Sequence, residues 1–136
     1  MIDQTKLPNS LEFVTYTDYN QIADAIKTLV VRGAPAIGVS GAFGLALAVL
    51  QCDTKDKDEL ITYLENAKKI LFQTRPTAVN LAWGLEKIMR VAKNAGTVDE
   101  IRKSVIDAAK LMANEDIQIN KSMGKIGSEL FNDNDT

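Results

Sequence analysis

The stretch VRGAPAIGVSGAFGLALAVL, residues 31–50, decides how this chain folds. After Arg32 it carries no charge until Asp53, although 25% of the 136 residues are charged. Pro35 suits the first turn of a helix, because its missing amide would have no partner within the helix there. A helix that is apolar on every side must be surrounded by other elements. The stretch therefore predicts a buried central helix from Pro35 to Leu50.

The start of this helix has the features of an anion site. The first backbone amides of a helix have no partner within it, and the helix dipole attracts negative charge. Arg32 stands just before the helix, and Gly33 and Ala34 would let a ligand approach the backbone closely. We therefore expect a helix start that holds a phosphate. The alternative is that Arg32 is a solvated surface charge.

The glycines inside the stretch have a structural explanation. Gly38, Gly41 and Gly44 recur every third residue, which predicts a face on which other helices pack closely.

The uncharged run is also near the lower length limit of a membrane span. Its glycines and the lack of a second such run argue against that interpretation, and we expect no membrane partner.

The composition narrows the class of function. A net charge of −2 argues against a nucleic-acid partner, which would need a basic patch. The absence of histidine removes the commonest general base and the commonest metal ligand. Cys52 is the single cysteine and is expected to be a packing residue. We expect no zinc-type metal cluster, and a cytoplasmic location because residues 1–10 lack the features of a signal peptide.

The rest of the chain predicts a mainly α domain around the central helix. Residues 11–15 (LEFVT) alternate well enough for one short strand. Another helix is expected from Ala78 to Ala92, with Gly96 as its stop. Three amphipathic stretches each follow a capping box, formed by Asp18 with Gln21, Asp56 with Glu59, and Thr97 with Glu100.

Residues 1–136 thus form a single domain in this prediction, a bundle of five to six helices with one short N-terminal strand. The number of helices stays open because the stretch that follows Thr97 could be one long helix or two. Residues 131–136 are expected to be a frayed polar tail.

Arg75 repeats the arrangement seen at Arg32. It precedes Pro76 and Thr77 at another helix start, so a guanidinium and free backbone donors again stand together. Guanidinium groups bind phosphate oxygens in a two-pronged way. The two junctions would form a phosphate pocket if they met, which sequence spacing cannot show. The alternative is that each arginine bonds a helix end or a nearby carboxylate.

The remaining polar candidates are weaker. Glu115 and Asp116 are adjacent, so they point apart on a helix and are expected on a solvated surface. Trp83 and Tyr63 are expected at core or boundary positions. The residues alone make anion binding plausible, but they reveal no acid, base or nucleophile.

Several segments, in order along the chain, resemble the signatures of the methylthioribose-1-phosphate isomerase family. The two long ones are VRGAPAIGV at residues 31–39 and RPTAVNL at residues 75–81. The others are the DQ-KLP pattern of residues 3–8, FGLALA at 43–48, Trp83 with Leu85, and Glu115-Asp116 with Asn120 and Gly124.

This resemblance implies an aldose–ketose isomerase of methionine salvage, which converts 5-methylthioribose 1-phosphate to 5-methylthioribulose 1-phosphate without a metal or redox cofactor. Arg32, Gly33 and Ala34 match the family's substrate-binding loop, and Arg75 matches its second substrate-binding arginine. The resemblance also implies a homodimer when the protein is complete.

The family's catalytic cysteine and aspartate belong to a C-terminal Rossmann-like half that would follow Thr136. We therefore expect no catalytic residue and no isomerase activity in these 136 residues, whose partner would be that missing half. Such a chain would be a fragment, a truncated protein or one part of a split gene. Two alternatives stay open within the same superfamily: a regulatory or assembly module related to translation initiation factor 2B subunits, and a fragment of a ribose-1,5-bisphosphate isomerase.

Overall fold

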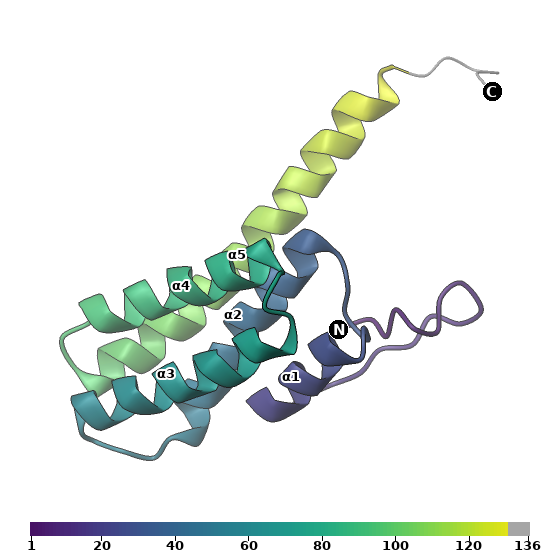
Figure 1. The fold of residues 1–136 in the computed structure, drawn as a ribbon. Helices are drawn as coiled ribbons and strands as arrows, with labels where there is room; N and C mark the ends of the chain where they lie inside the picture. The colour runs from purple at the N-terminus through teal and green to yellow at the C-terminus, as the bar shows by residue number, and fades with distance from the viewer. Residues whose placement is uncertain (131–136) are drawn as a thin grey trace.

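The computed structural model describes residues 1–130, which form a bundle of five α-helices with a long projecting end (Figure 1). The mainly helical prediction is confirmed. The option of a sixth helix is wrong for the described residues, because the last stretch is one continuous helix. The predicted tail at 131–136 lies outside them. The helices are α1 (Tyr19–Lys27), α2 (Ala34–Gln51), α3 (Lys57–Thr74), α4 (Val79–Asn94) and α5 (Val98–Ser128).

The predicted central helix is α2, which contacts each of the other four helices. Ala42, Leu45, Ala48 and Val49 on α2 are fully buried. The length and composition of α2 would also suit a membrane span, but 56% of it is buried within this fold. Its apolar side chains are therefore largely covered by the neighbouring helices.

The glycines of α2 permit close packing, as their spacing predicts. A Cβ atom at Gly38 would lie 2.7 Å from the carbonyl oxygen of Asn80 on α4. A Cβ atom at Gly84 on α4 would lie 2.5 Å from the carbonyl oxygen of Gly38. Gly41 and Gly44 likewise have leucine side chains within 2.8 Å of that position. Helices α2 and α4 therefore meet backbone to backbone.

We predict that Gly84→Ala lowers the free energy of unfolding by about 1–3 kcal/mol, because backbone atoms must move apart to admit the methyl group. The matched control is Gly124→Ala on α5, where nothing lies within 4 Å of the added Cβ. The control should be neutral or more stable by up to about 1 kcal/mol, since alanine is the better helix former. Urea denaturation measures both, and equal stability of the two variants would contradict the close contact.

The start of helix α1 and the start of helix α5 have the predicted capping boxes. Asp18 accepts a hydrogen bond from the backbone of the first turn, and the side chain of Gln21 accepts from the amide of Asp18. Thr97 and Glu100 form the same reciprocal pair. Local sequence alone therefore fixes where these two helices begin.

Two other predictions about helix ends need correction. Asp56 accepts from the Glu59 amide at 2.8 Å, but the Glu59 carboxylate bonds the hydroxyl of Thr54, so the box is half formed. Gly96 does not act as the left-handed stop of α4, because Gly33 is the only glycine with positive φ among the described residues. Its amide instead donates to the Glu100 carboxylate at 2.8 Å and belongs to the start of α5.

The predicted strand at residues 11–15 is wrong. Ile2 and Phe13 form a single antiparallel bridge, and no strand exists among residues 1–130. Leu11 and Phe13 are 62% and 72% exposed, so their alternating side chains find no core to cover them. A pattern of two-residue period produces a strand only where a partner and a buried face exist.

Arg102 on α5 holds the end of α2 in a way that the sequence did not reveal. Its half-buried guanidinium donates to the carbonyl oxygens of Val49 and Cys52, and to that of Thr54 at 3.2 Å. The last carbonyls of a helix have no partner within it and carry the negative end of its dipole. Arg102 therefore supplies both the missing donors and a compensating positive charge.

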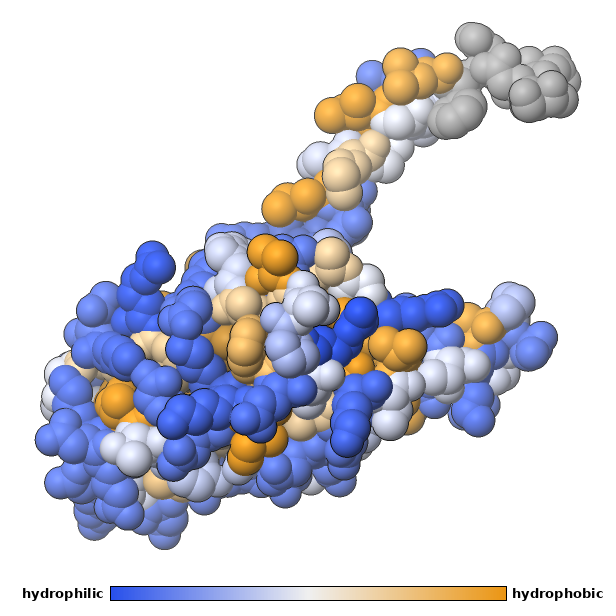
Figure 2. All heavy atoms as spheres, viewed as in Figure 1, coloured by the Kyte–Doolittle hydropathy of each residue, from blue (hydrophilic) through white to orange (hydrophobic). Residues whose placement is uncertain are grey.

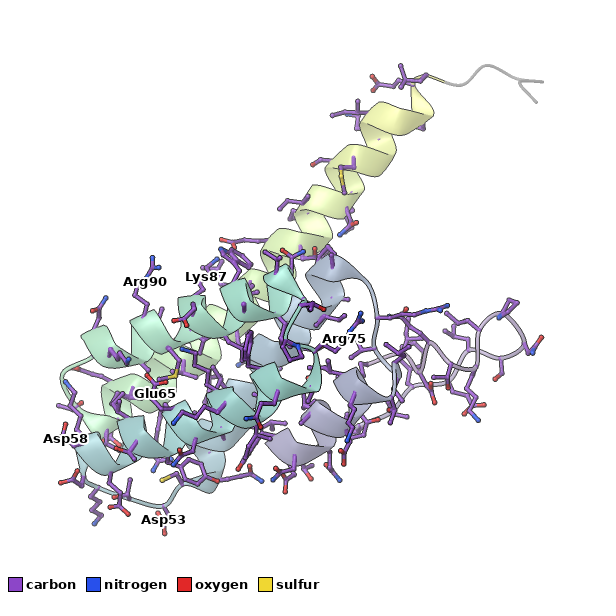
Figure 3. The ribbon with its side chains drawn as sticks, in the orientation of Figure 1. Asp53, Asp58, Glu65, Arg75, Lys87 and Arg90 are labelled. Atoms are coloured by element: carbon purple, nitrogen blue, oxygen red, sulfur yellow. The ribbon has the colours of Figure 1, made fainter. Side chains whose placement is uncertain are left out.

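We expect Arg102→Ala to lower the free energy of unfolding by about 2 kcal/mol, because it removes several hydrogen bonds from a charged donor. Arg90→Ala is the control, since Arg90 is exposed and points away from the bundle (Figure 3). Chemical denaturation should show little effect of the control, within about 0.5 kcal/mol. Comparable losses in the two variants would contradict the role assigned to Arg102.

The second half of α5 projects beyond the bundle as a single helix (Figure 1). Apolar side chains follow one another along this projection (Figure 2). The exposed apolar residues there are Ile117, Ile119, Met123 and Ile126, and the exposed Leu130 follows the end of the helix.

Candidate functional site

The two junctions that carry the arginine motifs lie at the same end of the bundle, where α2 and α4 begin and α3 ends (Figure 1). A hollow of about 390 Å³ opens between them. Its walls come from the start of α2, the α3–α4 connection and the start of α4. The lining residues are Gly33, Ala34, Ile37, Arg75, Thr77, Ala78, Val79 and Asn80.

The helices that begin at this hollow differ from the others in their N-terminal caps. The starts of α1, α3 and α5 are each capped by a side chain, from Asp18, Asp56 and Thr97. Neither α2 nor α4 has a side-chain cap. The first backbone amides of both helices are therefore free of side-chain acceptors and, together with the two helix dipoles, favour an anion in the hollow.

Gly33 fixes the direction in which α2 starts. It has φ +103°, a conformation that residues with a side chain rarely adopt. Nothing lies within 4 Å of an added Cβ, so the need for glycine comes from the backbone and not from crowding. Its carbonyl oxygen accepts the first helical hydrogen bond, from the amide of Ile37 at 3.0 Å.

Arg75 is half-buried at the end of α3 (Figure 3), where its carbonyl oxygen accepts from the amide of Ala78 at 3.0 Å. The ion pairs among residues 1–130 join other side chains, on α3, α4 and α5. The guanidinium of Arg75 thus brings a positive charge to the hollow that no described carboxylate neutralises. This answers the alternative that it pairs with a nearby acid.

Arg32 occupies a different position from the other three predicted site residues. Gly33, Ala34 and Arg75 line the hollow, whereas Arg32 is exposed and is not among the lining residues. Its carbonyl oxygen accepts a hydrogen bond from the side chain of Gln4 at 2.9 Å, and the Gln4 amide donates to Val30 at 2.9 Å. The N-terminal segment therefore holds the loop that presents Gly33.

Asp3 stabilises this N-terminal segment from within. One carboxylate oxygen accepts from the hydroxyl of Thr5 at 2.6 Å and from its amide at 3.0 Å. The hydroxyl bond is the main cause that lowers the pKa of Asp3, while burial opposes it and the amide bond adds to it. Asp3 therefore keeps its charge, and its bonds to Thr5, at neutral pH.

A second cleft, of about 220 Å³, is lined by residues of α2, α4 and α5 and shares Asn80 with the hollow. Trp83 lies there and is 54% exposed, so it is not a core residue. Lys87 sits 5.2 Å from the centre of its ring and bonds Glu115 at 3.1 Å. The lining residues are Pro35, Gly38, Val39, Asn80, Trp83, Met112, Glu115, Asp116 and Ile119.

Sequence reasoning missed this cleft because its walls come from three separate parts of the chain. Glu115 is exposed, as expected, and Asp116 is half-buried; what the sequence did not show is that both line the cleft. Asn80 was quoted only as part of a motif, yet it lines both the cleft and the hollow. Asn80 is the second residue of α4, whose start has no side-chain cap. This position in the sequence was the one signal that could have identified Asn80 as a candidate site residue.

We predict that Arg75→Ala weakens the binding of inorganic phosphate about tenfold or more, because hydrogen bonds to charged groups are worth about 1.5–3 kcal/mol. Isothermal titration calorimetry measures the affinity, and Arg90→Ala is the matched control. Thermal unfolding of the Arg75 variant should match that of the unchanged chain. Unaltered phosphate affinity, or a largely unfolded variant, would show that Arg75 has a structural role instead.

Arg32→Ala is predicted to weaken binding while leaving the fold intact, since the side chain is exposed and the bond from Gln4 reaches its backbone. Because Arg32 does not line the hollow, the loss of phosphate affinity should be smaller than that of Arg75→Ala. The loss should be largest at low ionic strength, because salt screens the attraction between distant exposed charges. The same titration at two salt concentrations measures this. A loss larger than that of Arg75→Ala would contradict the assignment of the hollow.

Known proteins resemble the chain along almost its whole length. Residues 30–136 match the initiation factor 2 subunit family. A putative methylthioribose-1-phosphate isomerase from Archaeoglobus fulgidus is 44% identical over 135 residues, which are 99% of this chain and 40% of that protein. The chain thus spans about 40% of the length of this curated relative.

Two solved structures share the fold. One, described as translation initiation factor eIF-2B, subunit delta, from A. fulgidus, has a TM-score of 0.91 and 44% identity, covering 99% of this chain and 40% of that one. The other, 5-methylthioribose 1-phosphate isomerase from Pyrococcus horikoshii OT3, has a TM-score of 0.90 and 39% identity, covering 96% of this chain and 37% of that one.

Proposed function

The chain belongs to the initiation factor 2 subunit family, and from this premise we propose that it is the substrate-binding N-terminal domain of a methylthioribose-1-phosphate isomerase. In this proposal the hollow receives the phosphate of 5-methylthioribose 1-phosphate. The isomerase names of its relatives support the choice of substrate. A place in methionine salvage, a cytoplasmic location and a homodimeric complete enzyme belong to the same proposal.

The observation that carries the proposal is the pair of uncapped helix starts beside Arg75. The starts of α2 and α4, whose first turns no side chain caps, and Arg75 all line a single hollow. A phosphate dianion accepts many hydrogen bonds and matches this set of donors. A neutral ligand would use neither the dipoles nor the charge.

The hollow is suited to binding rather than to proton transfer. Isomerisation of an aldose phosphate requires ring opening and the transfer of hydrogen between C2 and C1 of the sugar. A guanidinium offers hydrogen-bond donors and no acceptor, so Arg75 is a poor general base. Thr77 and Asn80 can donate hydrogen bonds to sugar hydroxyls but do not titrate. The proposal therefore assigns the acid and base groups to another part of the complete enzyme.

We predict that the 136-residue chain binds 5-methylthioribose 1-phosphate but does not convert it. ¹³C NMR of the labelled sugar phosphate, recorded over hours with the purified chain, follows both events. Line broadening without a ketose signal is the expected result. Ketose formed above the protein-free control would contradict the assignment of catalysis to another part of the enzyme.

A regulatory or assembly module is the second candidate, favoured by the initiation factor description of the A. fulgidus structure. The same bundle would then serve contacts with other subunits, and the hollow would hold no isomerase substrate. A folded chain that fails to bind 5-methylthioribose 1-phosphate would favour this candidate. Stronger binding of ribose 1,5-bisphosphate would favour an isomerase of that sugar phosphate.

A further inference from the structure

We propose that the cleft between α2, α4 and α5 is the subsite for the methylthio end of the sugar phosphate, and that Ile119 and Trp83 set the preference for that group. This inference rests on the proposed function and specifies which end of the substrate each cavity receives. It assigns a ligand to the second cavity, whose walls include the start of the projecting half of α5.

The cleft and the hollow are neighbours on the same pair of helices. Ala34 lines the hollow and Pro35 lines the cleft. Asn80 lines both. One small ligand can therefore extend from one cavity to the other around the start of α4. The contact at Gly38 forms part of the cleft wall, where a side chain would meet the Asn80 backbone.

The cleft has the chemistry that a thioether requires. Most of its lining side chains are apolar, and its volume of about 220 Å³ exceeds that of a methylthio group. Trp83 and Ile119 are 54% and 57% exposed, so the bundle itself leaves these apolar surfaces uncovered. Sulfur contacts aromatic rings favourably, and the ring of Trp83 is available for such a contact.

The charges of the two cavities orient the ligand. Lys87 offsets the charge of Glu115, with which it forms an ion pair at 3.1 Å. Asp116 leaves a net negative charge at the cleft, whereas Arg75 gives the hollow a positive one. A phosphate is therefore repelled from the cleft and attracted to the hollow, and the uncharged methylthio end enters the cleft.

The test is an NMR titration of the ¹⁵N-labelled 136-residue chain with inorganic phosphate, ribose 1-phosphate and 5-methylthioribose 1-phosphate. Trp83 is the one tryptophan of the chain, so a single indole N–H signal reports on the cleft. The amides of Gly33 and Ala34 report on the hollow. Phosphate and ribose 1-phosphate should shift mainly the hollow signals, whereas the methylthio sugar should shift both sets and bind roughly tenfold more tightly than ribose 1-phosphate.

Two matched substitutions on α5 make the test specific. Ile119→Glu places a charge in the cleft and should reduce the preference for the methylthio sugar to about one. Ile117→Glu places the same charge on an exposed residue of the same helix that does not line the cleft, and should retain the preference. Both isoleucines are exposed, so neither change should unfold the bundle, which circular dichroism would verify.

The outcomes separate this inference from the function on which it rests. Equal affinity for the two sugar phosphates, or an unshifted Trp83 signal when Gly33 and Ala34 respond, overturns the subsite but leaves the phosphate hollow in place. A preference that survives Ile119→Glu also overturns it. Failure of all three ligands to shift Gly33 and Ala34 overturns the proposed function, and the subsite with it.

Discussion

The backbone contact between Gly38 of α2 and Gly84 of α4 is the constraint on which the site depends. Because no side chain separates the two helices there, their first turns lie side by side at one end of the bundle. Both of these helices lack a capping side chain, and Arg75 at the end of α3 lines the same hollow. A larger residue at the contact would spread the helix starts apart and separate their free amides. The packing of the core and the geometry of the proposed anion site thus have one common cause.

The two ends of the central helix α2 are held by other parts of the chain in different ways. At its end, Arg102 supplies donors to carbonyl groups that have no helical partner. At its start, Gln4 holds the loop before Gly33, and no side chain of the described residues caps the first turn. The described residues therefore supply side-chain partners at one end of the central helix and none at the other, where the proposed phosphate site lies.

Local sequence was sufficient where short-range bonds decide the structure. The capping boxes at Asp18 and Thr97 and the central helix follow from residues within a few positions of one another. The meeting of the two arginine junctions did not follow, because it depends on a contact between residues 38 and 84. For the same reason the cleft around Trp83 was missed, and the strand at residues 11–15 was wrongly predicted because alternation does not show whether a partner exists.

The most direct test of the account is a crystal structure of the chain with 5-methylthioribose 1-phosphate, with phosphorus and sulfur located by their anomalous scattering. The account predicts the phosphate within hydrogen-bond distance of the Arg75 guanidinium and of the first amides of α2 or α4. A phosphate bound away from these groups, with the hollow filled by solvent, would contradict it.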